Sequence, residues 1–275
     1  MSSDKVRFIP PQRSTPDECF HCRTLFDLGF LRHRFRHWFS ASVGLLKFGM
    51  TLAEKALEVY RRLLELHGER AHVPRREPMH ELISTMLSHR TTAQNEQLAY
   101  DRMRERFGSW GNIRDAPVEA LAQAIAPSNY PDAKAPNIQK TLRRISDERN
   151  GFDLNFLADL SEEEAMSWLT SLPGVGVKTA TLVLLFCFAK RVIPVDTHLH
   201  RVCGRVGLIG EKTSAEAAHR ELLELLPPDP PLLYNFHIAM LRHGQKICVW
   251  KNPRCEKCPL TALCDWFQKN RAEDA

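Results

Sequence analysis

The sequence lacks any apolar run long enough to cross a bilayer, which needs about 20 consecutive apolar residues. Its longest apolar block, from Ala180 to Ala189, has the length of a buried helix. The first residues also lack the apolar stretch of a secretory signal, since none follows Lys5 and Arg7. We therefore expect an intracellular protein that has no contact with a membrane.

Alternating runs of the strand type are few, and no internal repeat is present. Apolar residues recur instead at spacings of three and four, which is typical of helices that bury one face. These spacings predict helices over residues 81–87, 92–107, 117–125 and 137–145, and Pro230 and Pro231 mark the place where a further helix over 232–242 would begin. The fold class that we expect is all-α.

Capping boxes mark further helix starts, because a Ser or Thr and a Glu three positions later satisfy each other's free backbone N–H groups. Such pairs are Thr51 with Glu54, Ser161 with Glu164, and Thr213 with Glu216. The twelve histidines fall mostly at positions that we expect on helix surfaces.

Residues 1–49 differ from the rest in charge and pattern. They hold eight Lys/Arg against four Asp/Glu, a net of +4, so residues 50–275 carry only 5 − 4 = +1. Any anion-binding face must therefore be local. Because helical periodicity starts abruptly after Met50, Met50 is a candidate for the natural initiator. If Met50 is the initiator, residues 1–49 are outside the natural protein. Otherwise we expect them to form a disordered basic extension.

A zinc-finger-like order of ligands also occurs in this extension, namely Cys19, Cys22, His33 and His37. The inner spacing is ten residues, whereas the usual finger has about twelve. No helix pattern accompanies the two histidines, so we do not expect a zinc site there.

Four cysteines lie within 17 residues near the C-terminus, in the pattern C-x6-C-x2-C-x5-C: Cys248, Cys255, Cys258 and Cys264. Four thiolates this close can enclose one compact metal centre. Structural zinc usually shows two C-x2-C pairs, and only one occurs here, so the spacing favours an iron–sulfur cluster over zinc. We expect Cys187 and Cys203, which lie outside this motif, to be buried core thiols.

A glycine turn occurs in Leu172-Pro173-Gly174-Val175-Gly176-Val177-Lys178-Thr179-Ala180. Two glycines permit a tight turn between helices and let backbone N–H groups approach a ligand. At the start of the next helix these groups favour an anion such as a phosphate. The alternative is an ordinary turn whose glycines serve geometry alone.

Lys178 and Asp196 are the candidate reactive pair. The positive potential at a helix N-terminus disfavours the ammonium of Lys178 and favours the nucleophilic amine. A nearby carboxylate acts in the opposite direction, so the sequence does not fix the pKa. Each residue also has a plainer interpretation, Lys178 as a surface charge and Asp196 as the cap of a helix over residues 197–206.

Taken together, LPGVGVKTA, the segment Val195-Asp196-Thr197-His198-Leu199-His200-Arg201-Val202 and the four cysteines resemble the endonuclease III family of helix-hairpin-helix DNA glycosylases, over residues 51–267. The resemblance implies a [4Fe-4S] cluster on the four cysteines. It also implies that Lys178 attacks C1′ of the damaged nucleotide and forms a Schiff base, that Asp196 assists, and that β-elimination breaks the strand. Relatives without lyase activity usually have Ser or Tyr in place of this lysine, so Lys178 favours a bifunctional enzyme.

The resemblance also implies an architecture. Residues 73–190 should form a six-helix barrel that carries the hairpin, and residues 50–72 with 191–275 a cluster domain. Damaged double-stranded DNA should bind in the cleft between them with the damaged base flipped out. The expected enzyme is a monomer, cytoplasmic and nucleoid-associated if the source is prokaryotic, and it removes oxidised pyrimidines.

The expected DNA contacts include two departures from the family pattern. Arg90 replaces the glutamine that fills the gap left by the flipped base, and Ala93 replaces an aspartate. In the wedge loop, Asn129 stands where the family has leucine, so Tyr130 is the expected wedge. The other expected contacts are Leu172, Gly174, Gly176, Thr179, Lys251 and Arg254.

These departures leave two alternatives open. One is a related glycosylase with altered lesion choice and weak lyase activity. The other is a cluster-bearing DNA-binding protein with little catalysis.

Overall fold

The computed structural model describes residues 49–74 and 76–273, and every regular element in this part is helical, as predicted. Our expectations for residues 1–48, including the motif of Cys19, Cys22, His33 and His37, fall outside the described residues. The α-helices are α2 (Leu52–His67), α3 (Pro78–Ser88), α4 (Ala93–Phe107), α5 (Trp110–Asp115), α6 (Val118–Ala124), α7 (Pro131–Arg149), α8 (Glu162–Thr170), α9 (Val177–Phe188), α10 (Thr197–Val206), α11 (Ala215–Leu225), α12 (Pro230–Lys246) and α13 (Asp265–Glu273). Short 3-10 turns are η2 (Asn155–Ala158), η3 (Cys255–Lys257) and η4 (Thr261–Leu263).

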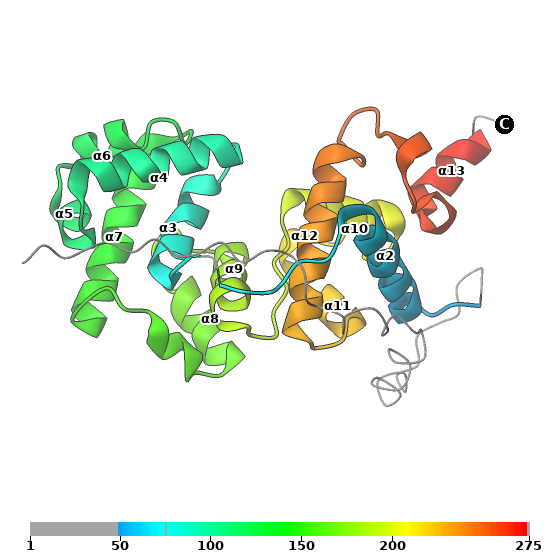
Figure 1. Ribbon diagram of the computed structural model, residues 1–275, viewed down its shortest axis with the longest axis horizontal. Helices are drawn as coiled ribbons and strands as arrows, with labels where there is room; N and C mark the ends of the chain where they lie inside the picture. Colours follow the sequence, from blue (N-terminus) through cyan, green and yellow to red (C-terminus); the bar gives the residue numbers. More distant parts are fainter. Residues whose placement is uncertain (1–48, 75, 274–275) are drawn as a thin grey trace, which may run out of the picture. The chain divides into compact units, whose positions relative to one another are not determined.

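The helices pack in two groups (Figure 1). In the first group α3 packs on α4, α7 and α9, α7 also packs on α5 and α6, and α8 packs on α9. In the second group α10 packs on α11, α12 and α13, while α2 returns from the start of the chain to lie on α12 and α11. Contacts between α9 and α12 join the groups. The division at residues 73 and 190 into two domains stays a prediction.

None of the helices in residues 49–74 and 76–273 is long and apolar enough to cross a membrane.

The largest departures from the predicted helices are at α7 and α5. Helix α7 was expected to start at residue 137 but begins at Pro131 and continues through Pro136. Pro131 occupies the first helical position, where a missing N–H costs nothing, and Pro136 removes only one hydrogen bond. Helix α5 was not expected, because its six residues include Gly111 and are too few to show a period.

Two of the predicted capping boxes are confirmed, at Thr51 with Glu54 and at Ser161 with Glu164. In the first, Glu54 N donates to Thr51 Oγ1 at 3.2 Å and Thr51 N donates to Glu54 Oε2 at 2.8 Å. These reciprocal bonds fix where α2 and α8 begin.

The third capping box, at Thr213 and Glu216, is wrong. Helix α11 starts one residue later than expected, with Ser214 Oγ accepting from Ala217 N at 3.1 Å. The Thr213 hydroxyl instead donates to Glu221 Oε2 at 3.1 Å. Because the Thr213 hydroxyl binds Glu221, it does not cap the helix.

A close contact at Gly207 ties the two ends of the described chain together. Gly207 follows α10 with φ of +82°, and a Cβ there would lie 1.8 Å from Oδ2 of Asp265. Asp265 Oδ1 accepts from the Lys55 ammonium at 2.9 Å, and the Lys55 side chain is 5% exposed. A glycine is thus required where α2 and α13 meet over the end of α10.

We expect Gly207→Ala to lower the free energy of unfolding by about 2–4 kcal/mol, because the left-handed backbone disfavours a side chain and a displaced Asp265 leaves the buried Lys55 ammonium unpaired. Denaturant unfolding measures this loss. Gly151→Ala is the matched control, since Gly151 has no left-handed φ and no neighbour within 4 Å. Equal stability of the two variants would contradict the account.

Candidate active site

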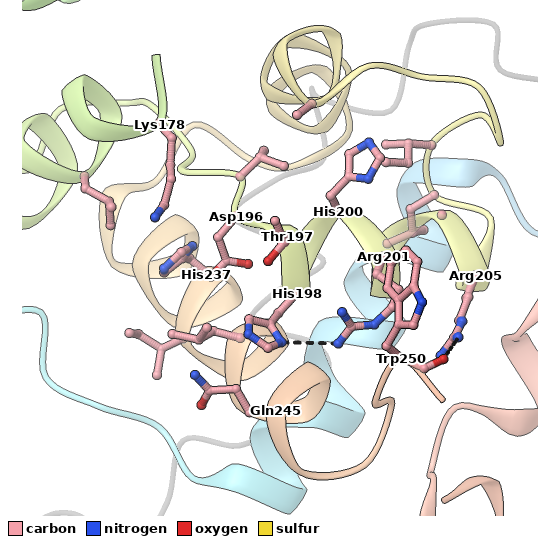
Figure 2. A pocket seen from close by; sticks show the side chains of 18 of the residues that line it. Lys178, Asp196, Thr197, His198, His200, Arg201, Arg205, His237, Gln245 and Trp250 are labelled. Carbon is pink, nitrogen blue, oxygen red and sulfur yellow. Dashed lines mark hydrogen bonds between the residues drawn. The ribbon is translucent and has the colours of Figure 1, made fainter. Parts of the chain in front are cut away.

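A large cleft of about 2580 Å³ is lined by residues from both helix groups. Five of the residues predicted for the site lie on its wall: Lys178, Asp196, Arg90, Asn129 and Tyr130. Lys178 comes from the first group and Asp196 from the second, and Figure 2 shows their side chains on neighbouring walls. The structure therefore brings together side chains that lie up to 106 positions apart in sequence (196 − 90).

The glycine turn before α9 is held in place by α7. Gly174 has φ of +76°, and a Cβ there would lie 3.0 Å from Cβ of Asn137. Thr141 Oγ1 donates to Pro173 O at 2.7 Å, and Arg144 Nη1 donates to Ser171 O at 2.9 Å. The turn therefore has a fixed position against α7, which only glycine permits at residue 174.

Lys178 is the second residue of α9, directly after the glycine turn. No side chain caps this helix start, so its first N–H groups remain available to an anion. Burial lowers the pKa of the Lys178 amine, while the charges of Asp196 and Glu96 oppose this shift. The net direction, which the sequence left open, favours the neutral nucleophilic amine.

Asp196 caps helix α10. Its Oδ1 accepts from Leu199 N at 2.7 Å, which is the capping role predicted as the plainer interpretation. Among the ion pairs of the described residues none joins Asp196 to Lys178. The carboxylate is thus fixed by its own helix and acts on Lys178 through its charge rather than through a direct bond.

Arg90, Asn129 and Tyr130 form a unit at the rim of the cleft. Arg90 and Tyr130 both have left-handed backbones, with φ of +55° and +58°. Asn129 Nδ2 donates to Arg90 O at 2.7 Å, and the Arg90 guanidinium lies 5.8 Å from the centre of the Tyr130 ring. The exposed Arg90 and Tyr130 side chains therefore present one cationic–aromatic surface.

Hydrogen bonds from Lys134 connect this rim to the end of α3. Its Nζ donates to Leu87 O at 2.7 Å, to His89 O at 2.8 Å and to Ser128 O at 2.9 Å. Burial lowers the pKa of Lys134 to about 8. Satisfaction of three carbonyl groups by one lysine holds the two rim loops against each other.

The other predicted DNA contacts are placed differently. Leu172 and Thr179 are 2% and 1% exposed, so their side chains belong to the core, and Thr179 Oγ1 lies 3.3 Å from His89 Nε2. Gly174 and Gly176 are exposed in the turn, and Lys251 and Arg254 are exposed in the cysteine loop. Of these six residues, four have surface for a ligand.

The four cysteines of the C-terminal motif line one small cavity together with residues of α10, α12 and α13. None of the four forms a disulfide. In the described part of the chain no group of three Cys, His, Asp or Glu side chains converges on a single ion. Four cysteine thiols around one cavity are the donor set that holds a [4Fe-4S] cluster in proteins, so these residues fit such a group.

The surroundings of the four thiols bear on how a thiolate would be stabilised there. Burial raises the pKa of Cys258 to about 11, so a thiolate there needs the positive charge of bound metal. His243 Nε2 lies 3.4 Å from Cys258 Sγ, and Arg205 Nη1 donates to Cys248 Sγ at 3.4 Å. These donors are able to stabilise sulfur that carries negative charge.

Helix α10 links the cysteine loop to Asp196. Arg205 donates from Nη1 to Val249 O at 2.8 Å and from Nη2 to Trp250 O at 2.9 Å. Arg201 Nε donates to Cys248 O at 3.0 Å. The helix that Asp196 caps is therefore the helix that holds the loop after the first cysteine.

Sequence reasoning missed several residues of the cleft. The expectation that histidines lie on helix surfaces is wrong for His237 and His243, which are 3% and 1% exposed. His237 lines the cleft, as does Trp250, which is 71% exposed beside Arg201. Their positions depend on how α12 and the cysteine loop pack, and neither leaves a local sequence signal.

His198 and the two remaining cysteines also have clear environments. His198 Nδ1 lies 3.2 Å from Arg201 Nη2, so this histidine pairs with the arginine rather than with Asp196 (Figure 2). Cys203 is fully buried, as predicted, whereas Cys187 is only half-buried, so the prediction of a buried core thiol is wrong for Cys187. Burial raises the pKa of Cys187 to about 12, which makes it an unreactive thiol.

Comparison with known proteins gives consistent matches. A family model described as HhH-GPD superfamily base excision DNA repair protein matches residues 83–228. The chain is 33% identical over 218 residues to endonuclease III of Thermotoga maritima, covering 79% of this chain and 94% of that protein. It is 30% identical over 192 residues to endonuclease III of Escherichia coli K12, covering 70% and 85%.

Solved structures give the same result. The structure of a trapped endonuclease III–DNA covalent intermediate superposes with a TM-score of 0.70 at 27% identity, covering 81% of this chain and all of that one. A thermostable thymine-DNA glycosylase shares the fold, with a TM-score of 0.64 at 24% identity over 78% of this chain and 97% of that one.

The capping role of Asp196 predicts a difference between two substitutions. Asp196→Ala should lower the free energy of unfolding by about 1 kcal/mol, because Leu199 N loses its acceptor. Asp196→Asn should change it by less than about 0.5 kcal/mol, because asparagine caps as well as aspartate. Urea unfolding of both variants measures the difference. An alanine variant as stable as the asparagine variant would show that the carboxylate does not hold the helix.

Proposed function

The chain belongs to the HhH-GPD superfamily of base excision DNA repair proteins and is a DNA glycosylase of the endonuclease III family, and from its site we propose that it is bifunctional. It removes oxidised pyrimidines from duplex DNA and then cuts the strand as a lyase. The observation that carries this proposal is the partly buried Lys178 amine, whose pKa is lowered, in one cleft with the fixed Asp196 carboxylate.

Lys178 is the proposed nucleophile. Its amine forms a bond to C1′ of the damaged nucleotide as the bond from C1′ to the base breaks, and the base leaves with the electron pair. The sugar ring then opens to a Schiff base with Lys178. Loss of a C2′ proton and departure of the 3′ phosphate break the strand by β-elimination.

Asp196 supports this reaction by its charge. A carboxylate fixed by its own helix does not need to reorganise when positive charge develops on the sugar. It also raises the pKa of Lys178, against the larger effect of burial. The balance leaves an amine that is more nucleophilic than an exposed lysine and still paired with a counter-charge.

The proposed DNA contacts follow the exposed surfaces of the site. Backbone N–H groups at Gly174 and Gly176 and the uncapped start of α9 bind phosphate. The exposed Lys251 and Arg254 add phosphate contacts from the cysteine loop. Arg90 and Tyr130 enter the helix where the base is flipped out. We propose that the enzyme binds DNA as a monomer.

The proposed cofactor is a [4Fe-4S] cluster held by Cys248, Cys255, Cys258 and Cys264. Its contribution is structural, because it fixes the loop that carries Lys251 and Arg254 and the packing of that loop on α10. We also propose the division into a barrel domain, residues 73–190, and a cluster domain, residues 50–72 and 191–275, on the two sides of the cleft.

A second candidate is a glycosylase with a different lesion choice, and the rim favours it specifically. The Arg90 guanidinium lies over Tyr130, and an arginine edge only donates hydrogen bonds. It therefore suits an orphaned base that presents acceptors. Excision measured on a panel of oxidised pyrimidines and mismatches, each opposite guanine and adenine, separates this candidate from the first.

The lysine assignment predicts a covalent adduct. With borohydride and duplex DNA that contains an abasic site, the wild-type chain should form a stable protein–DNA product, and Lys178→Gln should form none, because an amide cannot make a Schiff base. Gel electrophoresis measures the product. The matched control is Lys140→Gln on the exposed face of α7, which should trap as the wild type does. Trapping by Lys178→Gln at the wild-type rate would contradict the assignment.

The cluster assignment predicts a brown protein with about four irons per chain. Cys258→Ser should lose most of the iron and the colour, because one of the four thiolates is removed. Cys187→Ser, which alters a thiol outside the motif, should keep both. Iron analysis and the visible spectrum measure the outcome. A colourless wild-type protein that contains about one zinc would contradict the cluster.

A further inference from the structure

His237 lies in the wall of the cleft on α12, and the proposed reaction has given it no role. The side chain is 3% exposed. Figure 2 shows its ring beside the end of the Lys178 side chain and next to Asp196. Burial lowers the pKa of His237; of the neighbouring charges, Asp196 raises it and Lys178 lowers it. The ring is therefore neutral and lies between the two proposed reactive groups.

The hydrogen bond of His237 to the backbone determines its tautomer. Nδ1 lies 2.9 Å from Pro194 O, and because a carbonyl oxygen only accepts, Nδ1 carries the proton. In a neutral ring the other nitrogen, Nε2, then has a free lone pair and is an acceptor. No residue in the described part of the chain donates to Nε2.

The remaining neighbours of the ring do not compete for this lone pair. Phe186 of α9 presents an aromatic ring with its centre 5.7 Å away. His219 of α11 binds the carbonyl of Ile193 through Nδ1 at 2.7 Å, and burial lowers its pKa, so it is neutral too. The positive charge that acts on His237 is that of Lys178.

We propose that His237 is a positioning residue for Lys178. No hydrogen bond joins the two side chains in the structure, but the flexible Lys178 head group lies beside the ring, and by turning to donate a hydrogen bond to Nε2 of His237 it directs its lone pair into the cleft. The inference rests on the proposed function of Lys178. Both the ammonium and the neutral amine have N–H groups, so the contact persists when Lys178 loses its proton. A fixed direction matters because lysine has a flexible four-carbon stem, and a misplaced nucleophile reacts far more slowly.

Two substitutions separate this role from a structural one. In His237→Asn the amide N–H can replace Nδ1–H toward Pro194, but nothing replaces the acceptor at Nε2. In His237→Gln the longer side chain places an amide oxygen near the Nε2 position, and the bond to Pro194 is lost. Positioning predicts that Asn is impaired and Gln is active, whereas a structural role predicts the reverse order.

The experiment is borohydride trapping of the full, cluster-loaded chain on abasic-site duplex DNA across a range of pH. We expect His237→Asn to trap about 10- to 100-fold more slowly than wild type. The acidic limb of its pH profile should move to lower pH, because the ammonium of Lys178 loses an acceptor that stabilises it. His237→Gln should stay within about threefold of wild type, with its limb unmoved.

Two controls accompany the trapping. Affinity for duplex DNA with a reduced, unreactive abasic site should be the same for all three proteins, and thermal unfolding reports whether each variant is folded. A readout that needs no variant is the ¹⁵N spectrum of the wild-type histidines, where His237 should show a protonated Nδ1 and a hydrogen-bonded acceptor Nε2.

Three results would overturn the proposal: wild-type trapping rates and pH profile in His237→Asn, greater impairment of His237→Gln than of His237→Asn, or a protonated Nε2 in the spectrum. If the wild-type chain traps normally, these results leave the proposed function intact. If the wild-type chain forms no adduct at all, the proposed function itself fails.

Discussion

The proposed chemistry depends on one physical constraint, the partial burial of the Lys178 ammonium group. Lys178 lies at the start of α9, where burial lowers its pKa and no side chain caps the helix. A lysine held in this way is more easily deprotonated than one on the surface. The glycine turn before it and the packing of α7 against that turn fix its backbone, so the amine enters the cleft from a defined point.

The opposite wall supplies the counter-charge through a second constraint. Asp196 caps α10, and further along the same helix Arg201 and Arg205 hold the loop that carries the cysteines. The position of the carboxylate and the folding of the C-terminal segment are therefore linked through one helix. This link gives the proposed metal centre a role although it takes no part in the proposed bond-making steps: a cluster on the four cysteines would stabilise the wall from which Asp196 acts.

Much of this arrangement could be predicted from local sequence patterns. Capping boxes located the starts of α2 and α8, and the candidate pair of Lys178 and Asp196 falls in one cleft. Features that depend on tertiary packing could not be predicted. Thr213 bonds to Glu221 instead of capping its helix, two prolines obscured the start of α7, and Thr179 faces the core. His237 enters the site only because α12 packs against α9, and its sequence neighbourhood gives no indication of this.

The central claim is that the Lys178 amine bonds to the deoxyribose. The most direct measurement is mass spectrometry of peptides from the protein–DNA product after reduction with borohydride and digestion of both components. The account predicts a single peptide with a sugar remnant, and fragmentation should locate the remnant on Lys178. A remnant on any other amine of the chain, or a reduced product without a modified peptide, would contradict it.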